Sequence, residues 1–338
     1  MVEETNSVED KKYSSAKTEK AEQGQVNQTN VNLSRTKIEL ISLAGNIYNQ
    51  SPNSRLVFAG QALRMIKEEF IPHEVLGDFS NCHIVITMAI LNAKPTYYTP
   101  EQQALMKQDL MAVYNDLAQN QSLKNQVKEI RLCVLEKGLA EITQYINQGK
   151  DYPRSEYKIG RLDIFTHGIP GRFLMADHLD EDVPYQLTME NGISAWSKEG
   201  FHKKAKLHSW ACRTCAPNHG QPSLAEGMAN HLQIPVYGFQ KKSDYADTWG
   251  SRDDRSTLRG CNHPYTLGLL MSKEEEASCQ RLQEEYRQRE SYKKGKGAIW
   301  MDSGAVHPVK CGTSPSNLPE GRYVAKPGIQ GVSKVDAE

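Results

Sequence analysis

The chain has 338 residues, enough for two domains or for one large domain with tails. Its 41 Lys and Arg residues balance 41 Asp and Glu residues, so the formal net charge is zero and gives no electrostatic reason to expect nucleic acid or an anionic membrane as the main partner. The hydrophobic content of 38% is low for a globular chain, which predicts that part of the length stays outside a packed core.

The apolar runs and the cysteines indicate whether the protein spans a membrane, is exported or forms disulfides. The longest apolar run, residues 84–91, is far shorter than the roughly 20 residues of a membrane-spanning helix, so we expect no membrane span. The first residues, MVEETNSVEDKKYSSAK, lack the apolar stretch of a conventional signal peptide. We therefore expect a cytoplasmic protein, or one exported without such a peptide. Seven scattered cysteines, an odd number, favour reduced thiols, metal ligands or a nucleophile over a disulfide framework.

The first 150 residues divide into a polar tail and a mainly helical region. Residues 1–34 are polar and show no apolar period, which predicts a disordered tail. Helical spacing of apolar residues predicts helices in two places, on the faces Ile38, Ile41, Ala44, Tyr48 and Ala59, Ala62, Leu63, Ile66. Thr99 followed by Pro100 and Gln102 is a capping box that starts another helix, and a long helix is predicted over 123–146. Residues 83–91 are the exception, because this β-branched run fits a buried strand, although its length leaves the assignment ambiguous.

Residues 151–338 have the pattern of an α/β domain. Short apolar runs predict strands at 161–166, 207–211 and 234–239, and an amphipathic helix at 223–232 separates the last two. A strand, a helix and a strand with short connections predict a parallel βαβ unit. Farther on, a capping box at Ser272 begins a charged helix that runs to about residue 292. The remaining residues predict a loop-rich C-terminal extension of short strands and turns.

Chemistry-bearing residues follow two of these predicted strands. The first strand ends in His167-Gly168, and the second ends in Ala211-Cys212. Because the carboxyl ends of parallel strands share one edge of a sheet, the His and the Cys could face the same crevice. A neighbouring imidazole helps a thiol to ionise. The backbone N–H groups of Gly168 and Cys212 could then form an oxyanion hole.

This arrangement resembles the caspase-like cysteine peptidases, which include caspases, separase, gingipains and the bacterial CHAT domains. In that family His-Gly follows one strand and the nucleophilic Cys follows the next, and the segments 223–232 and 235–237 are similar to the helix and strand after the Cys in bacterial members. The resemblance implies a mostly parallel sheet flanked by helices, His167 as general acid and base, and Cys212 as nucleophile. It also implies a protein or peptide substrate, no cofactor, and a role such as that of a bacterial effector or toxin.

Two other interpretations compete with a peptidase. The same fold could serve a non-catalytic effector as an interaction scaffold. Alternatively, the spacing of His208, Cys212, Cys215 and His219 includes a Cys-x2-Cys pair typical of structural zinc, and Cys261 with His263 could supply a second ligand pair. An acidic loop holds Asp177, Asp180 and Asp182, which are weak candidates for binding a basic substrate side chain.

Overall fold

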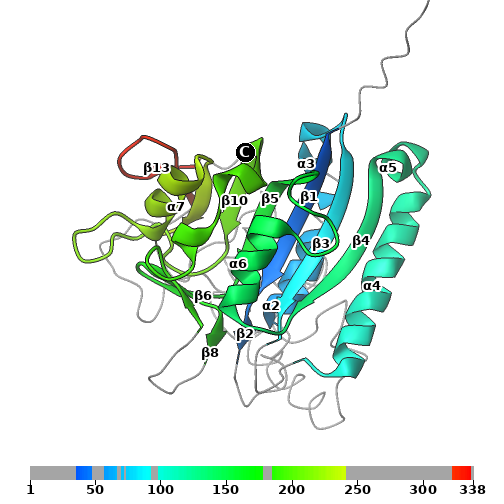
Figure 1. The fold of residues 1–338 in the computed structure, drawn as a ribbon, viewed down its shortest axis with the longest axis horizontal. Coiled ribbons are helices and arrows are strands. Elements are labelled where there is room, and N and C mark those ends of the chain that lie inside the picture. The colour runs from blue at the N-terminus through cyan, green and yellow to red at the C-terminus, as the bar shows by residue number, and fades with distance from the viewer. Residues whose placement is uncertain are drawn as a thin grey trace, which may run out of the picture. The chain divides into compact units, whose positions relative to one another are not determined.

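An eight-stranded sheet forms the centre of the computed structural model (Figure 1). The structure describes residues 36–47, 57–66, 70–71, 74–92, 98–177, 185–240 and 322–335. In order across the sheet, the strands are β13 (Ser333–Lys334), β12 (Arg322–Ala325), β11 (Val236–Phe239), β10 (Phe201–Ser209), β5 (Tyr157–Phe165), β1 (Lys37–Ala44), β3 (His83–Leu91) and β4 (Val127–Leu135). The strands from β11 to β4 are parallel to one another. Strand β12 pairs antiparallel with β11, and β13 pairs antiparallel with β12. The fold is therefore α/β with a mostly parallel sheet flanked by helices, which confirms the predicted class.

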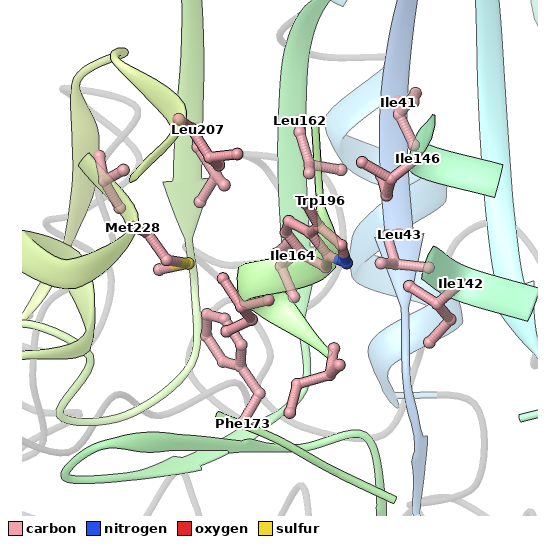
Figure 2. Close-up of a cluster of buried hydrophobic side chains, with 14 of the residues drawn as sticks. Ile41, Leu43, Ile142, Ile146, Leu162, Ile164, Phe173, Trp196, Leu207 and Met228 are labelled. Atoms are coloured by element: carbon pink, nitrogen blue, oxygen red, sulfur yellow. The ribbon is translucent and has the colours of Figure 1, made fainter. Parts of the chain in front are cut away.

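Helices cover both faces of the sheet (Figure 1). The helices α2 (Val57–Met65) and α4 (Pro100–Ala118) contribute to a core on one face, joined there by the short helix α3 (Glu74–Asp78). On the opposite face, α6 (Leu139–Gln148) and α7 (Leu224–Leu232) pack over a second core, where Figure 2 shows side chains of the sheet meeting those of the helices. Both faces of the central strands are thus apolar, as parallel sheets require.

The order of the strands reverses direction between β1 and β5. From β1 the chain moves outward through β3 to β4, whereas from β5 it moves the other way through β10 to β11. In open α/β sheets, ligands bind outside the carboxyl ends of the strands at such a switch point. The segment that follows β5, which begins at Thr166, lies at this carboxyl edge of the sheet.

Several predicted elements are confirmed. The run 83–91 is the buried strand β3, and the Ala59 stripe belongs to α2. Thr99 caps α4: its side chain accepts the Gln102 N–H, and the Gln102 side chain accepts the Thr99 N–H. Strands β10 and β11 pair in parallel on either side of α7, as the predicted βαβ unit requires.

The prediction of a mainly helical region over 35–150 is wrong in two places. Ile38, Ile41 and Ala44 belong to β1, because a strand buried on both faces has apolar residues at positions that also fit helical spacing. Tyr48, the fourth residue of this predicted face, lies outside the described residues. The helix predicted over 123–146 is instead α5 (Gln121–Gln126), strand β4 and helix α6. In β4, which lies at the edge of the sheet, the buried residues Val127, Ile130 and Cys133 are three positions apart, a spacing that imitates a helix.

Residues 35–150 and 151–338 contribute strands to the same sheet. Strand β1 lies between β3 and β5 and pairs with both in parallel, so one sheet includes strands from either side of that boundary. The predicted disordered tail over 1–34, the charged helix over 272–292 and most of the C-terminal extension lie outside the described residues. Within the described ranges, no helix is long and apolar enough to cross a membrane.

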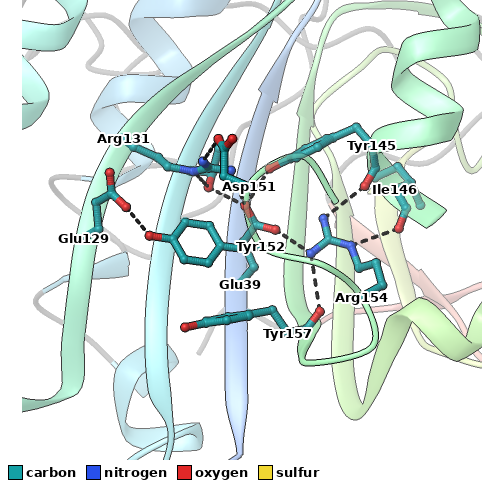
Figure 3. Close-up of polar contacts among 10 residues, drawn as sticks. Glu39, Glu129, Arg131, Tyr145, Ile146, Asp151, Tyr152, Arg154 and Tyr157 are labelled. Atoms are coloured by element: carbon teal, nitrogen blue, oxygen red, sulfur yellow. Dashed lines mark hydrogen bonds and ion pairs between the residues drawn. The ribbon is translucent and has the colours of Figure 1, made fainter. Parts of the chain in front are cut away.

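A buried polar network joins β1 to the loop before β5 (Figure 3). The Glu39 carboxylate is fully buried and forms an ion pair of 2.5 Å with Arg154, while Arg131 lies 3.6 Å away. The hydroxyls of Thr87 and Tyr145 donate to the same carboxylate, at 2.5 Å and 2.7 Å. Burial, and secondarily the charge of Glu39, raises the pKa of Tyr145 well above its ordinary value, so the hydroxyl stays a donor.

Candidate functional site

The two predicted strand-end motifs lie at the same edge of the sheet. After β5 ends at Phe165, His167 begins β6 (His167–Ile169), which forms a hairpin with β7 (Arg172–Leu174). Strand β10 ends at Ser209, and Cys212 follows three residues later. Because β5 and β10 are parallel neighbours with Ile164 opposite Ser209, both motifs leave the sheet side by side.

The backbones of the two motifs are in direct contact. A Cβ atom at position 168 would lie 2.3 Å from the carbonyl oxygen of Cys212, 3.2 Å from its nitrogen and 2.9 Å from the Cβ of Ala211. Real Cβ atoms do not approach backbone oxygen so closely, so only glycine fits here. The structure therefore brings the predicted His167-Gly168 pair against the predicted nucleophile, from segments more than 40 residues apart.

The side chains of His167 and Cys212 are both partly or largely shielded from solvent. His167 is half-buried, and its ring forms a T-shaped contact with the ring of Phe58 in α2, with centroids 5.1 Å apart and planes at 81°. Cys212 is 9% exposed, whereas Cys215 is 1% exposed. Burial raises the pKa of the Cys215 thiol strongly, which makes that side chain an inert component of the core.

The segment 210–216 that carries Cys212 is tied to three elements. The Trp210 N–H donates to Ile164 of β5 at 3.0 Å, and the Cys215 N–H donates to Phe239 of β11 at 2.9 Å. The Thr214 carbonyl accepts the N–H of Ala225 in α7 at 3.0 Å. Arg213 has a φ of +58°, a left-handed conformation that is uncommon for residues other than glycine. Such conformations cluster at functional sites, where the surrounding structure holds them.

A second contact joins the His hairpin to the chain beyond Cys212. Gly171, at the turn between β6 and β7, has a φ of +81°, and a Cβ there would lie 2.5 Å from the side-chain nitrogen of Asn218. Asn218 and Gln221 form a bridge across a turn whose central residues, His219 and Gly220, both have positive φ. The two loops therefore lie together beside the His167 and Cys212 segments.

A polar cluster that the sequence analysis missed links the His strand to the Cys strand. The Trp210 Nε1–H donates to Asp163 Oδ1 at 2.7 Å, and Arg161 forms two bonds to the same carboxylate, at 2.6 Å and 3.0 Å. Arg161 and Asp163 alternate with apolar residues along β5, a sequence signal that marks one face of the strand. The cluster stabilises the pairing of β5 and β10 just below the candidate site.

The alternative zinc set is not assembled. His208 is buried with its Nδ1 against the Arg322 guanidinium, and His219 is exposed in a turn. The Cys215 thiol faces the Tyr323 carbonyl at 3.9 Å. Among the residues that the structure describes, no group of three or more His, Cys, Asp or Glu side chains could hold a metal ion. The physical reason is that β10 ends at Ser209, so only His208 lies on the strand, while Cys212 and Cys215 lie in the turn after it and His219 lies in a further turn.

Of the remaining predicted site residues, the structure describes only Asp177. Asp177 ends β8 (Ala176–Asp177), whose backbone pairs with β2 (Asn46–Ile47). Asp180 and Asp182, and the alternative zinc pair Cys261 and His263, lie outside the described residues.

Comparison with known proteins adds no assignment. No protein-family model matches the chain, and no curated protein matches its sequence significantly.

Proposed function

We propose that the protein is a cysteine endopeptidase that uses His167 and Cys212 as a catalytic dyad. The observation that carries this proposal is the contact between Gly168 and the Cys212 backbone, since it joins two motifs that were each predicted to bear one half of the chemistry. Their position at the carboxyl edge of the sheet, next to the switch point between β1 and β5, is where α/β folds bind ligands.

The order of strands supports the caspase-like form of this proposal. The resemblance requires two strands before the His strand, and the parallel strands β1 and β3 supply them. The Cys strand β10 follows next to the His strand β5, and the segment after Cys212 continues into α7 and β11. Strand β4 is an additional strand at the edge of this arrangement.

The proposed reaction is acyl transfer to sulfur. The Cys212 thiol gives its proton to His167, and the thiolate attacks the carbonyl carbon of a peptide bond, while the N–H groups of Gly168 and Cys212 hold the resulting oxyanion. His167 donates a proton to the amine as the C–N bond breaks, leaving a thioester on Cys212. Water deprotonated by His167 then hydrolyses the thioester and releases the acid. These steps use no metal ion and no organic cofactor.

The test is the reactivity of Cys212 with iodoacetamide as a function of pH, measured by peptide mapping. In the dyad, we expect alkylation near pH 7 to fall by about tenfold or more in His167→Ala, because the imidazole stabilises the thiolate. The half-buried Cys82 is the internal reference, since it is distant in sequence and its pKa is raised by burial.

A peptide library completes the test. Wild-type protein should generate cleavage products, and Cys212→Ala should generate none while unfolding at the same temperature. If alkylation of Cys212 does not depend on His167 and no peptide is cleaved, the interaction scaffold replaces the peptidase.

A further inference from the structure

Two buried hydroxyls lie directly behind the peptide that carries the Cys212 N–H. Ser209, the last residue of β10, and Thr214 are 2% and 1% exposed, and their side-chain oxygens are 2.6 Å apart. The Thr214 hydroxyl also donates to the Ala211 carbonyl at 3.3 Å. If Thr214 donates to Ala211, its oxygen is the acceptor and Ser209 is the donor. The three groups therefore form one chain, from the Ser209 hydroxyl through Thr214 to the Ala211 carbonyl.

The last hydrogen bond of this series, from Thr214 to the Ala211 carbonyl, orients the peptide group between Ala211 and Cys212. The Ala211 carbonyl and the Cys212 N–H belong to the same planar trans peptide, so they point in opposite directions. Holding the carbonyl toward the buried Thr214 directs the N–H to the opposite side of the peptide. Gly168 packs against the same residue, since a Cβ there would lie 3.2 Å from the Cys212 nitrogen. Hydrogen bonds in series also polarise each other, which makes the N–H a stronger donor.

The surroundings leave little room for a different arrangement. A Cβ at Gly238 of β11 would lie 3.2 Å from the Thr214 Cβ and 3.6 Å from the Ser209 Cβ, so this strand packs tightly against both residues. Ala225 of α7 donates to the Thr214 carbonyl. The hydroxyl pair is thus held by rigid elements on either side.

We propose that Ser209 and Thr214 are positioning residues that orient and polarise the Ala211–Cys212 peptide as an oxyanion donor. This inference rests on the proposed function, because it assigns these residues a role in the same acyl transfer. Neither side chain touches the reacting atoms. Their effect is expected in the step that forms an oxyanion and not in reactions of the thiol that form none.

Two small electrophiles separate these reactions in the full-length protein. Attack of the Cys212 thiolate on 4-nitrophenyl acetate passes through an oxyanion, releases 4-nitrophenolate and leaves an acetyl thioester. Alkylation by iodoacetamide displaces iodide and forms no oxyanion. The ratio of the two rate constants at Cys212, followed by mass spectrometry with Cys212→Ala as background, therefore reports the oxyanion donor alone.

We expect Thr214→Val to lower this ratio by about tenfold, part of the effect of losing a whole donor. Thr214→Ser keeps the hydroxyl and should restore the ratio, and Ser209→Ala, which leaves the Thr214 bond to Ala211, should give an intermediate value. Thermal unfolding of each variant provides the folding control. If Thr214→Val does not fold, Ser209→Ala tests the hydrogen bonds from Ser209 through Thr214 to Ala211.

Three results would overturn the inference: an unchanged ratio in Thr214→Val, an equal loss in Thr214→Ser, or a wild-type ratio no higher than that of Cys82. Failure of the proposed function has a different signature. In that case His167→Ala leaves the alkylation of wild-type Cys212 unchanged, whatever the ratio between reagents.

Discussion

Gly168 is the residue at which the segments carrying His167 and Cys212 meet, and its missing side chain allows the contact. In Gly168→Ala, the added methyl would lie 2.3 Å from the Cys212 oxygen, so the two backbones must separate. We expect a loss of about 1–3 kcal/mol in the free energy of unfolding, the usual cost of overpacking. The rate of Cys212 alkylation near pH 7 should fall by about tenfold, because the dyad is displaced.

A second glycine provides the matched control for this prediction. Gly77 lies in helix α3, and a Cβ there would meet no atom within 4 Å. Gly77→Ala should therefore leave the reactivity of Cys212 unchanged and stabilise the protein by up to about 1 kcal/mol, because alanine favours helix. Urea unfolding and iodoacetamide labelling of both variants check the pair. Equal behaviour of the two variants would contradict the contact at Gly168.

His208 makes the stability of the fold dependent on pH. Burial lowers the pKa of His208 well below 6.5, with further lowering by the positive charges of Arg161, Arg322 and Lys206. In the unfolded chain the imidazole has its ordinary pKa, so below about pH 6.5 the unfolded state binds more protons than the folded state. This contribution to stability is therefore present above pH 6.5 and is lost as the pH falls through and below that value.

The measurement is the free energy of unfolding in urea between pH 7.5 and pH 5. One titrating group changes it by at most about 1.4 kcal/mol per pH unit. His208→Gln keeps a hydrogen-bonding side chain facing Arg322 but does not titrate, so its profile should be flatter than that of the wild type. Parallel profiles for both proteins would show that other groups cause the acid sensitivity.

At the scale of residues, the sequence predicts the chemistry but not the contacts that organise it. His167 and Cys212 could be selected because each follows an apolar run and has a side chain suited to acyl transfer. The Ser209–Thr214 bond is local, but the segment between the two residues includes the left-handed Arg213, which no sequence rule predicts. The contact of His208 with Arg322 joins residues 114 positions apart, so only the folded sheet reveals it.

At the scale of elements, prediction succeeded where local signals were strong. The predicted capping box at Thr99 begins α4, because its side chain satisfies an N–H group that otherwise lacks a partner. The predicted amphipathic helix over 223–232 is α7 (Leu224–Leu232). Prediction failed for β1, whose residues are buried on both sides by the rest of the fold. In such a strand the pattern of two faces disappears, and short apolar runs fit helix and strand equally.

The buried network around Glu39 predicts a large effect of a single change in β1. Glu39→Ala would leave Arg154 buried without its carboxylate and would remove the acceptor of Thr87 and Tyr145. Breaking a buried ion pair from one side costs about 3–5 kcal/mol, and we expect a loss of this size in the free energy of unfolding. The exposed pair of Lys37 and Glu156, at 2.5 Å, offers the control. Glu156→Ala should leave the urea midpoint nearly unchanged because solvent screens that pair.

The network also explains why β1 could not be recognised as a central strand from its sequence. Glu39 is an acidic residue within an apolar run, and it is acceptable there only because β3, β4 and the loop before β5 supply its partners. Those partners lie 48 to 115 residues away. The cost of burying the charge is offset by contacts that exist only after the sheet has formed.

For the whole molecule, the decisive feature is that one sheet crosses the boundary that composition suggested at residue 150. Strand β5, which carries the His motif, pairs with β1 on one side and β10 on the other. The apolar side chains of β5 share one core with those of β1 and α6, and Figure 2 shows Ile142 and Ile146 of that helix beside Ile41 and Leu43 of β1. The candidate site is therefore built on elements from both sides of the boundary.

This architecture predicts how fragments of the chain will fold. A fragment of residues 151–338 lacks β1, β3, β4 and α6, so β5 would have an unpaired edge and the core that it shares with β1 and α6 would be exposed. We expect it to show no cooperative thermal transition. A fragment of residues 35–338 retains every described strand and should unfold at the temperature of the full chain. Calorimetry of both fragments measures the difference, and a sharp transition for residues 151–338 alone would mean that the α/β half folds independently and that β1 adds only an outer layer to it.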